Sequence, residues 1–156
     1  MIEIAVPDFG TMTLEHLVLD YNGTLAVDGV LLDGVGSRLT RLAEALTVHV
    51  VTADTFGRAR EGLSGLPVSL TILDPENQSA AKASYVQGLG ADRTAAVGNG
   101  RNDRLMLARA ALGIAVLEAE GASVLSVQAA DVLSPGITHA LDLLLHPGRL
   151  VATLRD

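Results

Sequence analysis

An aspartate, Asp20, stands directly after the apolar run Leu17-Val18-Leu19 and just before the turn-forming pair Asn22-Gly23. A carboxylate in such a position can attack a phosphorus atom and form an acyl phosphate. The attack needs a cation beside it, because phosphate oxygens repel a carboxylate, and Mg²⁺ with its oxygen ligands suits this task. Gly23 would let the backbone turn and bring its N–H groups to the phosphate. Asp20 is therefore the first candidate for phosphate chemistry.

Four further residues could complete such a site. Thr52 ends a β-branched run and could donate its hydroxyl hydrogen to a phosphate oxygen. Lys82 lies in a helical segment and could supply the positive charge that stabilises a transferring group. Asp103 and Asn99 come shortly after the apolar run 94–97 and could complete the metal site. Together these positions predict a phosphate and magnesium site.

These residues can meet only if the elements that carry them end at one edge. Short apolar runs alternate with helical patterns, which predicts a three-layer α/β/α, Rossmann-like domain with a central, mainly parallel sheet. Ligands of such sheets bind at the carboxyl ends of the strands, where Asp20, Thr52 and Asn99 stand. The expected strands are 2–6, 17–20, 48–52, 68–73, 94–97, 114–117, 124–127 and 131–133. The expected helices are 34–46, 55–63 (with Asp54 as its cap), 78–89, 103–111 and 137–145.

Four segments carry the candidate residues in a fixed order: 17–24, 48–54, 80–83 and 95–103. In order and context they resemble the four motifs of the haloacid dehalogenase (HAD) superfamily. The last segment has the form Gly-x-Gly-x-Asn-Asp, which is most similar to P-type ATPase phosphorylation domains and their soluble relatives. The resemblance covers nearly the whole chain, 1–156, as one HAD-like hydrolase domain. It implies an Mg²⁺-dependent phosphatase of phosphoric monoesters.

The resemblance also implies a role for each position. Asp20 would be the nucleophile and a metal ligand, and the main-chain carbonyl of Asn22 would be a second ligand. Asn99 and Asp103 would complete the metal site. The residues implied to contact phosphate are Thr52, Ala53, Gly23 and Lys82.

Two positions depart from the family pattern. Phosphatases have an aspartate two residues after the nucleophile as general acid and base, and here that residue is Asn22, which cannot exchange a proton at neutral pH. General acid–base help is worth roughly 10²–10⁴-fold in rate. Asn99 stands where the pattern usually has aspartate, and an amide oxygen holds Mg²⁺ more weakly than a carboxylate. We therefore expect weak metal affinity and slow turnover.

The same departures favour a rival from another class. A HAD-fold domain that lost efficient catalysis could bind phosphate or metal and act through protein partners. Simpler interpretations also exist for single residues: Asn22-Gly23 could only build a turn, and Lys82 could be an ordinary solvated helix residue. His49 alternates with apolar residues and is expected to pack in the sheet.

Substrate access is predicted from the lengths of two intervals. Larger family members carry an inserted cap domain that selects substrate. Residues 25–33 leave room only for a short hairpin with Asp28-Gly29 as its turn, and residues 54–82 supply only one helix and one strand. We expect an open site, suited to a phosphorylated small molecule or macromolecule, or covered by a neighbouring subunit of a homo-oligomer.

Composition argues against several other classes of protein. The formal net charge is −7 and no Lys/Arg cluster occurs, so nucleic-acid binding is not expected. No apolar run reaches the about 18–20 residues that span a bilayer, and the early Glu3 argues against a signal peptide. The absence of cysteine excludes disulfides and thiolate sites and fits a cytoplasmic protein.

Overall fold

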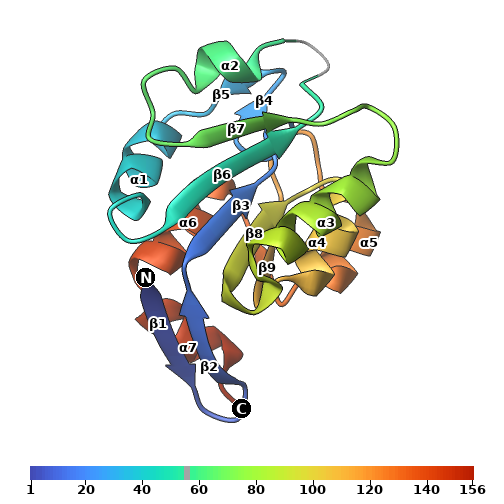
Figure 1. The fold of residues 1–156 in the computed structure, drawn as a ribbon. Coiled ribbons are helices and arrows are strands. Elements are labelled where there is room, and N and C mark those ends of the chain that lie inside the picture. Colours follow the sequence, from blue (N-terminus) through green and yellow to red (C-terminus); the bar gives the residue numbers. More distant parts are fainter. Residues whose placement is uncertain (55–56) are drawn as a thin grey trace.

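A six-stranded sheet in the order β10-β9-β8-β3-β6-β7 forms the centre of the protein (Figure 1). The structure is a computed structural model that describes residues 1–54 and 57–156. All strand pairs of this sheet are parallel. Its strands are β3 (His16–Leu19), β6 (Thr47–Thr52), β7 (Ser69–Ile72), β8 (Thr94–Gly98), β9 (Leu112–Val116) and β10 (Val132–Ser134).

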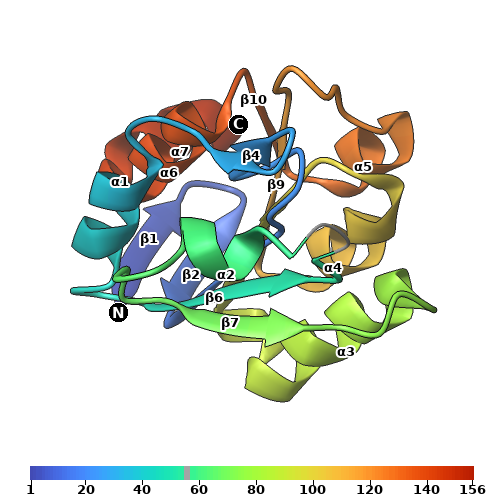
Figure 2. The same cartoon turned by 90° about the horizontal axis from the view of Figure 1, so that it is seen from above.

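Helices cover both faces of the sheet, as Figures 1 and 2 show. One face carries α1 (Val35–Leu42), α6 (Ile137–Leu145) and α7 (Gly148–Leu154). The other carries α3 (Gln78–Leu89), α4 (Arg104–Arg109) and α5 (Val124–Ala129). The three-layer α/β/α architecture expected from the sequence is therefore confirmed. Among the described residues, no helix has the length and apolar character needed to cross a membrane.

Alternating side chains on the central strands build two separate cores. On β3, Leu17 and Leu19 face the α1/α6 side, while Val18 faces the α3/α4 side. The second core contains small strand residues such as Ala96 and Ala115, which let α3 and α4 approach the sheet closely. Lys82 and Asp103 are buried on that side, so packing of the helices brings their charges to the sheet.

Two hairpins form separate two-stranded sheets. β1 (Ile2–Val6) and β2 (Gly10–Leu14) pair antiparallel and project beyond the amino end of β3, with α7 packed against β1 (Figure 1). β4 (Ala26–Val27) and β5 (Val30–Leu31) form the short hairpin expected within 25–33. Asp28 and Gly29 both have positive φ, 51° and 78°, as a tight two-residue hairpin turn requires.

The expected strand at 124–127 is wrong, because these residues form helix α5. The central sheet offers no place for another strand here, since β9 is already flanked by β8 and β10. Val124 is 68% exposed, whereas the side chain of Ser126 is buried and donates a hydrogen bond to the carbonyl of Gly100. Valine favours a strand only where that strand can be buried in a sheet.

The expected helix at 55–63 is also corrected. Helix α2 spans only Ala59–Gly62, and residues 55 and 56 lie outside the described part of the chain. Asp54 and Gly57 have positive φ (45° and 67°), so the chain turns here before a helix begins. The Asp54 carboxylate accepts a hydrogen bond from the Ala59 N–H, although Arg58 occupies the N-cap position.

The remaining expected elements are present with ends shifted by a few residues. The helices expected at 78–89 and 137–145 match α3 and α6. Short 3₁₀ turns, Ala91–Arg93 and Arg101–Asp103, precede β8 and α4. Strand β2 and helix α7 were not expected from the sequence.

Candidate active site

The carboxyl ends of β3, β6 and β8 bring most of the candidate residues to one cavity. β3 lies between β8 and β6, and the Asp20 N–H donates to the carbonyl of Val97 on β8 at 3.0 Å. The cavity has a volume of about 260 Å³. Its walls are formed by Asp20, Asn22, Thr52, Ala53, Gln78, Asn99, Gly100 and Asn102.

Beneath this cavity, Lys82 joins two carboxylates. Its ammonium donates to Oδ1 of Asp20 at 2.7 Å and to Oδ1 of Asp103 at 2.6 Å. The lysine and Asp103 are fully buried, and Asp20 is 6% exposed on the cavity side. The second Asp103 oxygen accepts hydrogen bonds from the N–H groups of Asn99 and Gly100 at 3.0 and 2.9 Å. One ammonium between two carboxylates leaves a net charge of −1 when all three are ionised.

The pKa values of the site follow from this burial. Burial, followed by repulsion from Asp103, raises the pKa of Asp20 to about 6, although Lys82 opposes the shift. Burial alone would lower the pKa of Lys82, but the attraction of Asp20 and Asp103 outweighs it and raises that pKa. Lys82 is therefore a permanent cation, while Asp20 loses its proton close to neutral pH.

Asn99 presents its side-chain oxygen, not its amide hydrogens, to the Thr24 hydroxyl beside Asp20. Its Nδ2 donates to the carbonyl of Gly121 at 3.0 Å, which turns Oδ1 toward the hydroxyl of Thr24. That hydroxyl lies 3.1 Å from Asn99 Oδ1 and 3.3 Å from Asp20 Oδ2. Gly23 has φ of 77°, and a Cβ on it would stand 2.4 Å from Asn99 Nδ2. Glycine is thus required at residue 23 by both backbone geometry and space.

These oxygens fit a divalent cation. Among the described residues, no three His, Asp or Glu side chains cluster as a metal site. However, Thr24 has one hydroxyl proton for two acceptors, Asp20 Oδ2 and Asn99 Oδ1, so lone pairs of both remain available at the cavity. An all-oxygen donor set with one net negative charge suits Mg²⁺. Asp103 is already engaged by Lys82 and two N–H groups, so it contributes mainly charge.

The structure places Thr52 and Ala53 on the cavity wall opposite the loop after β8. Thr52 is buried, and its Oγ1 accepts a hydrogen bond from the Asp54 N–H at 3.1 Å. Its own hydroxyl hydrogen can therefore be donated to a bound group. Asn22 also lines the cavity, and its side chain makes no hydrogen bond to any described residue.

Sequence reasoning missed three residues of the site. Thr24 lies inside the first sequence segment, 17–24, but was not predicted to be a site residue. Gln78 gave no signal of its own: it meets the cavity only because α3 begins beside the loop after β8, where Asn102 Nδ2 donates to Gln78 Oε1 at 2.7 Å. Gly100 donates its N–H to Asp103.

Every buried side-chain nitrogen and oxygen among the described residues has a hydrogen-bond partner.

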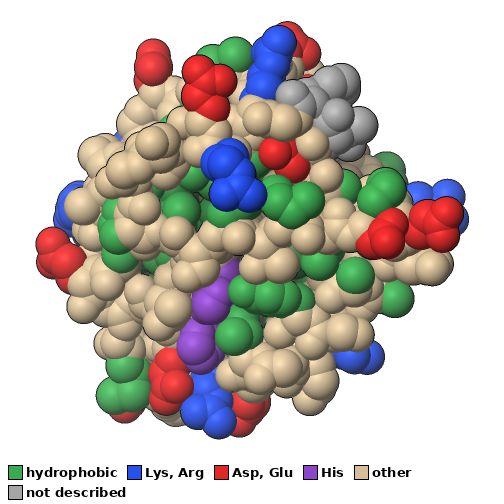
Figure 3. Space-filling model, turned by 45° about the horizontal axis from the view of Figure 1, so that its top comes forward, with side chains coloured by type: hydrophobic (Ala, Val, Ile, Leu, Met, Phe, Trp, Pro, Cys, Tyr) green, Lys and Arg blue, Asp and Glu red, His purple; other side chains and the backbone are tan. Residues whose placement is uncertain are grey.

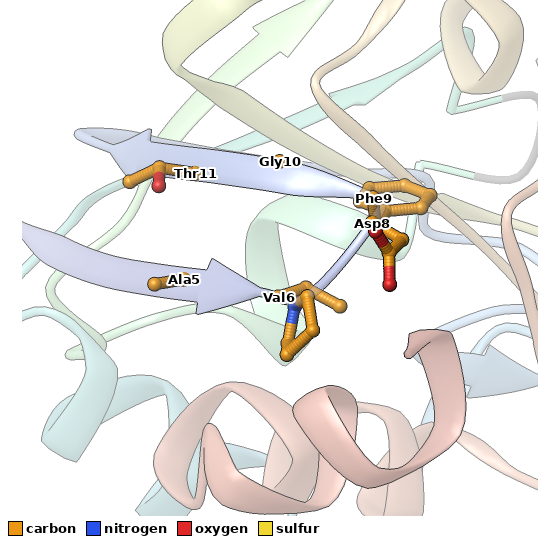
Figure 4. Close-up of a pocket in the computed structure, with 7 residues that line it drawn as sticks. Ala5, Val6, Asp8, Phe9, Gly10 and Thr11 are labelled. Carbon is orange, nitrogen blue, oxygen red and sulfur yellow. The ribbon is translucent and has the colours of Figure 1, made fainter. Parts of the chain in front are cut away.

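The surface also has a cavity outside the candidate active site. A cavity of about 520 Å³ lies at the turn of the β1–β2 hairpin and is lined by residues such as Ala5, Val6, Asp8 and Phe9 (Figure 4). It contains no candidate residue and lies at the other end of the molecule from the carboxyl ends of the strands (Figure 1). On the face shown in Figure 3, Lys and Arg side chains are scattered among acidic ones.

Comparison with known sequences gives relatives without a stated activity. No family model matches the chain. Over 61 residues the chain is 49% identical to uncharacterized protein MJ0073 of Methanocaldococcus jannaschii, which covers 39% of this chain. Over 39 residues it is 46% identical to uncharacterized protein MJ0072 of the same organism, which covers 25% of this chain. The matched part is 66% of the first relative, just under two thirds of its length, and 89% of the second.

Comparison with solved structures identifies the fold. Cobalt-bound deoxy-D-mannose-octulosonate 8-phosphate phosphatase from Haemophilus influenzae superposes with a TM-score of 0.71 at 16% identity, over 92% of this chain and 94% of that one. The Moraxella catarrhalis phosphatase, in complex with magnesium, phosphate and KDO, gives 0.68 at 15% identity, over 91% and 94%. A zinc-transporting PIB-type ATPase gives 0.59 at 22% identity, over 79% of this chain and 20% of that one.

The chain therefore has the HAD fold, as the four sequence segments predicted. It is the cap-less form, because only β4 and β5 lie between β3 and α1, and only α2 and β7 are described between β6 and α3. These superpositions, at identities of 15–22%, establish the fold alone.

Proposed function

We propose that this protein is an Mg²⁺-dependent phosphatase of phosphoric monoesters that works through a phosphorylated Asp20. The observation that carries the proposal is the buried contact of one lysine ammonium with two carboxylates, beneath a cavity walled by hydroxyl, amide and carboxylate groups. Burying three charges costs folding free energy, and charge clusters of this kind beside a cavity are typical of functional sites. The HAD phosphatases that share the fold support the same reaction class.

In the first step, each residue of the site has a separate role. A carboxylate oxygen of Asp20 forms a bond to phosphorus while the bond from phosphorus to the leaving oxygen breaks, and the electron pair leaves with the alkoxide. Lys82 fixes the orientation of the Asp20 carboxylate and offsets negative charge on the transferring group. The Thr52 hydroxyl donates to a phosphate oxygen, and Gly23 lets the backbone approach it.

In the second step, water attacks phosphorus and the bond to Asp20 breaks, which releases phosphate. Mg²⁺, when bound, offsets the repulsion between the carboxylates and the phosphate oxygens. Asp20, the Asn22 carbonyl and Asn99 would hold it, with Asp103 adding charge. Asn22 cannot supply or remove a proton, so water must protonate the leaving group, and we expect slow turnover.

The test is release of phosphate from an aryl phosphate with Mg²⁺. We expect turnover by the native chain and none above background by Asp20→Asn, which keeps the size of the side chain. Asp92→Asn, an exposed matched change, should retain full activity. Phosphate release that persists in Asp20→Asn would contradict the proposal.

One observation favours a second candidate. The two amides, Asn22 and Asn99, both line the cavity where the pattern has carboxylates. A domain that binds phosphate and Mg²⁺ and acts through protein partners would need no proton relay. Trapping with beryllofluoride and Mg²⁺ combined with no aryl phosphate turnover would favour this candidate over the enzyme.

Because no cap covers the cavity, the residues that line it must determine which substrate binds. We propose a phosphorylated small molecule as substrate, as the phosphatases of known structure suggest. A homo-oligomer whose neighbouring subunit covers the site stays a prediction, as do the cytoplasmic location and the single domain.

A further inference from the structure

A second polar hollow adjoins the candidate active site. It has a volume of about 500 Å³ and lies where the amino end of α3 meets the start of α4. Its lining includes Gln78, Ser79, Asn102 and Arg104, and we call it the α3–α4 groove. Gln78 and Asn102 line both the groove and the catalytic cavity.

The two residues shared by the cavities form a hydrogen-bonded pair. Asn102 Nδ2 donates to Gln78 Oε1 at 2.7 Å, and Gln78 is only partly buried. A phosphoester with its phosphorus at Asp20 extends its leaving group along the residues that line the cavity, and Gln78 and Asn102 are among them. Because both hollows share these two side chains, the groove is the candidate site for that leaving group.

The groove carries one cation. Arg104 donates through Nη1 to the Ser79 hydroxyl at 2.9 Å and to the carbonyl of Arg101 at 2.8 Å. These bonds hold the guanidinium in place while its other two nitrogens make no hydrogen bond to the described residues. Within the described part of the chain, no carboxylate forms an ion pair with Arg104.

We propose that the α3–α4 groove binds the leaving group of the substrate and that this leaving group carries a carboxylate, which Arg104 holds. This inference rests on the proposed phosphatase activity and specifies its substrate class. A planar guanidinium with free donors matches the two oxygens of a carboxylate. A second phosphate, with nearly two charges, fits less well, because Asp74 and Glu76 flank the groove residue Pro75 and add negative charge.

The experiment compares matched substrates. A series of alkyl phosphates with two to six carbons and a terminal carboxylate is paired with the same chains ending in a neutral hydroxyl, all with Mg²⁺. For the chain length that reaches the groove, we expect kcat/KM to be at least about tenfold higher for the carboxylated member, as one charge-assisted contact supplies.

Variants assign the preference to Arg104. Arg104→Gln should remove the preference through a rise in KM for the carboxylated substrate, while Arg104→Lys should keep part of it. Arg109→Gln, an exposed charge change on the same helix, should leave it intact. Circular dichroism confirms that each variant is folded.

The outcomes separate the two claims. Equal kcat/KM for both members at every length, or a preference that persists in Arg104→Gln, overturns the groove assignment while the phosphatase proposal stands. A preference for the members with a second phosphate, tested alongside, also overturns the carboxylate assignment. Absence of turnover with every substrate, aryl phosphate included, counts against the phosphatase proposal itself.

Discussion

Lys82 is the residue on which the charge balance of the site depends. It is fully buried on α3, yet it contacts Asp20, which follows β3, and Asp103, which precedes α4. Without it, two buried carboxylates would face each other with no cation between them, which costs several kcal/mol per uncompensated charge. With it, the site keeps a single net negative charge, which attracts a divalent cation, and the cation in turn attracts a phosphate dianion.

At the residue scale, we also expect the amide of Asn22 to limit catalysis. Asn22→Asp should raise turnover of an alkyl phosphate by roughly 10²-fold or more, because a carboxylic acid can protonate the leaving alkoxide. Steady-state phosphate release measures this effect. Asn102→Asp, in the same cavity wall but bonded to Gln78, should give no such gain. A slower or unchanged Asn22→Asp enzyme would show that this position does not act on the leaving group.

The raised pKa of Asp20 gives a stability prediction. Because burial raises the pKa from 3.8 to about 6, the folded chain holds this proton more tightly than the unfolded chain does. The native protein should therefore lose stability as pH rises from about 4 to about 6, by on the order of 3 kcal/mol from this group, and lose no more above that range.

The measurement uses Asp20→Asn, which cannot titrate. In urea denaturation with EDTA present, the variant should gain stability relative to the native chain between about pH 4 and pH 6. Asp92→Asn, at an exposed position, should show no such pH-dependent difference. A difference that stays constant across this window would mean that Asp20 has an ordinary pKa in the folded state.

At the scale of elements, the close approach of α4 to β9 decides whether Asp103 reaches Lys82. A Cβ at Gly113 on β9 would stand 2.4 Å from the carbonyl oxygen of Leu107 on α4. Gly113→Ala must therefore push α4 outward, and we expect a loss of about 1–3 kcal/mol in the free energy of unfolding. Turnover should fall as well, because α4 follows Asp103 directly.

Gly88 on α3 provides the matched control. A Cβ there meets no atom within 4 Å, so Gly88→Ala should stabilise the helix by about 0.5–1 kcal/mol. Urea denaturation of both variants checks the pair. Equal effects at the two glycines would mean that the contact between α4 and β9 does not limit packing.

At the scale of the whole molecule, cation binding should be visible as stability. If the site takes Mg²⁺ only when folded, the ion at 100 times its Kd should raise the free energy of unfolding by about 2.7 kcal/mol. Thermal unfolding with and without EDTA measures the shift, and Asp20→Asn should abolish most of it. A shift of equal size in that variant would place the bound ion elsewhere.

The sequence alone determined the class of fold and the identity of the candidate residues. Apolar runs that alternate with helical patterns predict a parallel sheet, and Asp20, Thr52 and Asn99 fall at strand ends for that reason. These are local properties of the chain. The run 124–127 shows their limit, since its valines suit a strand, yet it forms helix α5 beside a sheet in which β9 already has both neighbours.

Only the tertiary structure decided how charges and acceptors pair. Lys82 lies 62 residues from Asp20 and 21 from Asp103, and its sequence gives no sign that it is buried between them. The orientation of the Asn99 amide depends on Gly121, and the place of Gln78 depends on how α3 packs beside the loop after β8. Electrostatic and hydrogen-bond energies vary with distances of a few ångströms, and such distances between remote residues are set by the packing of the whole fold.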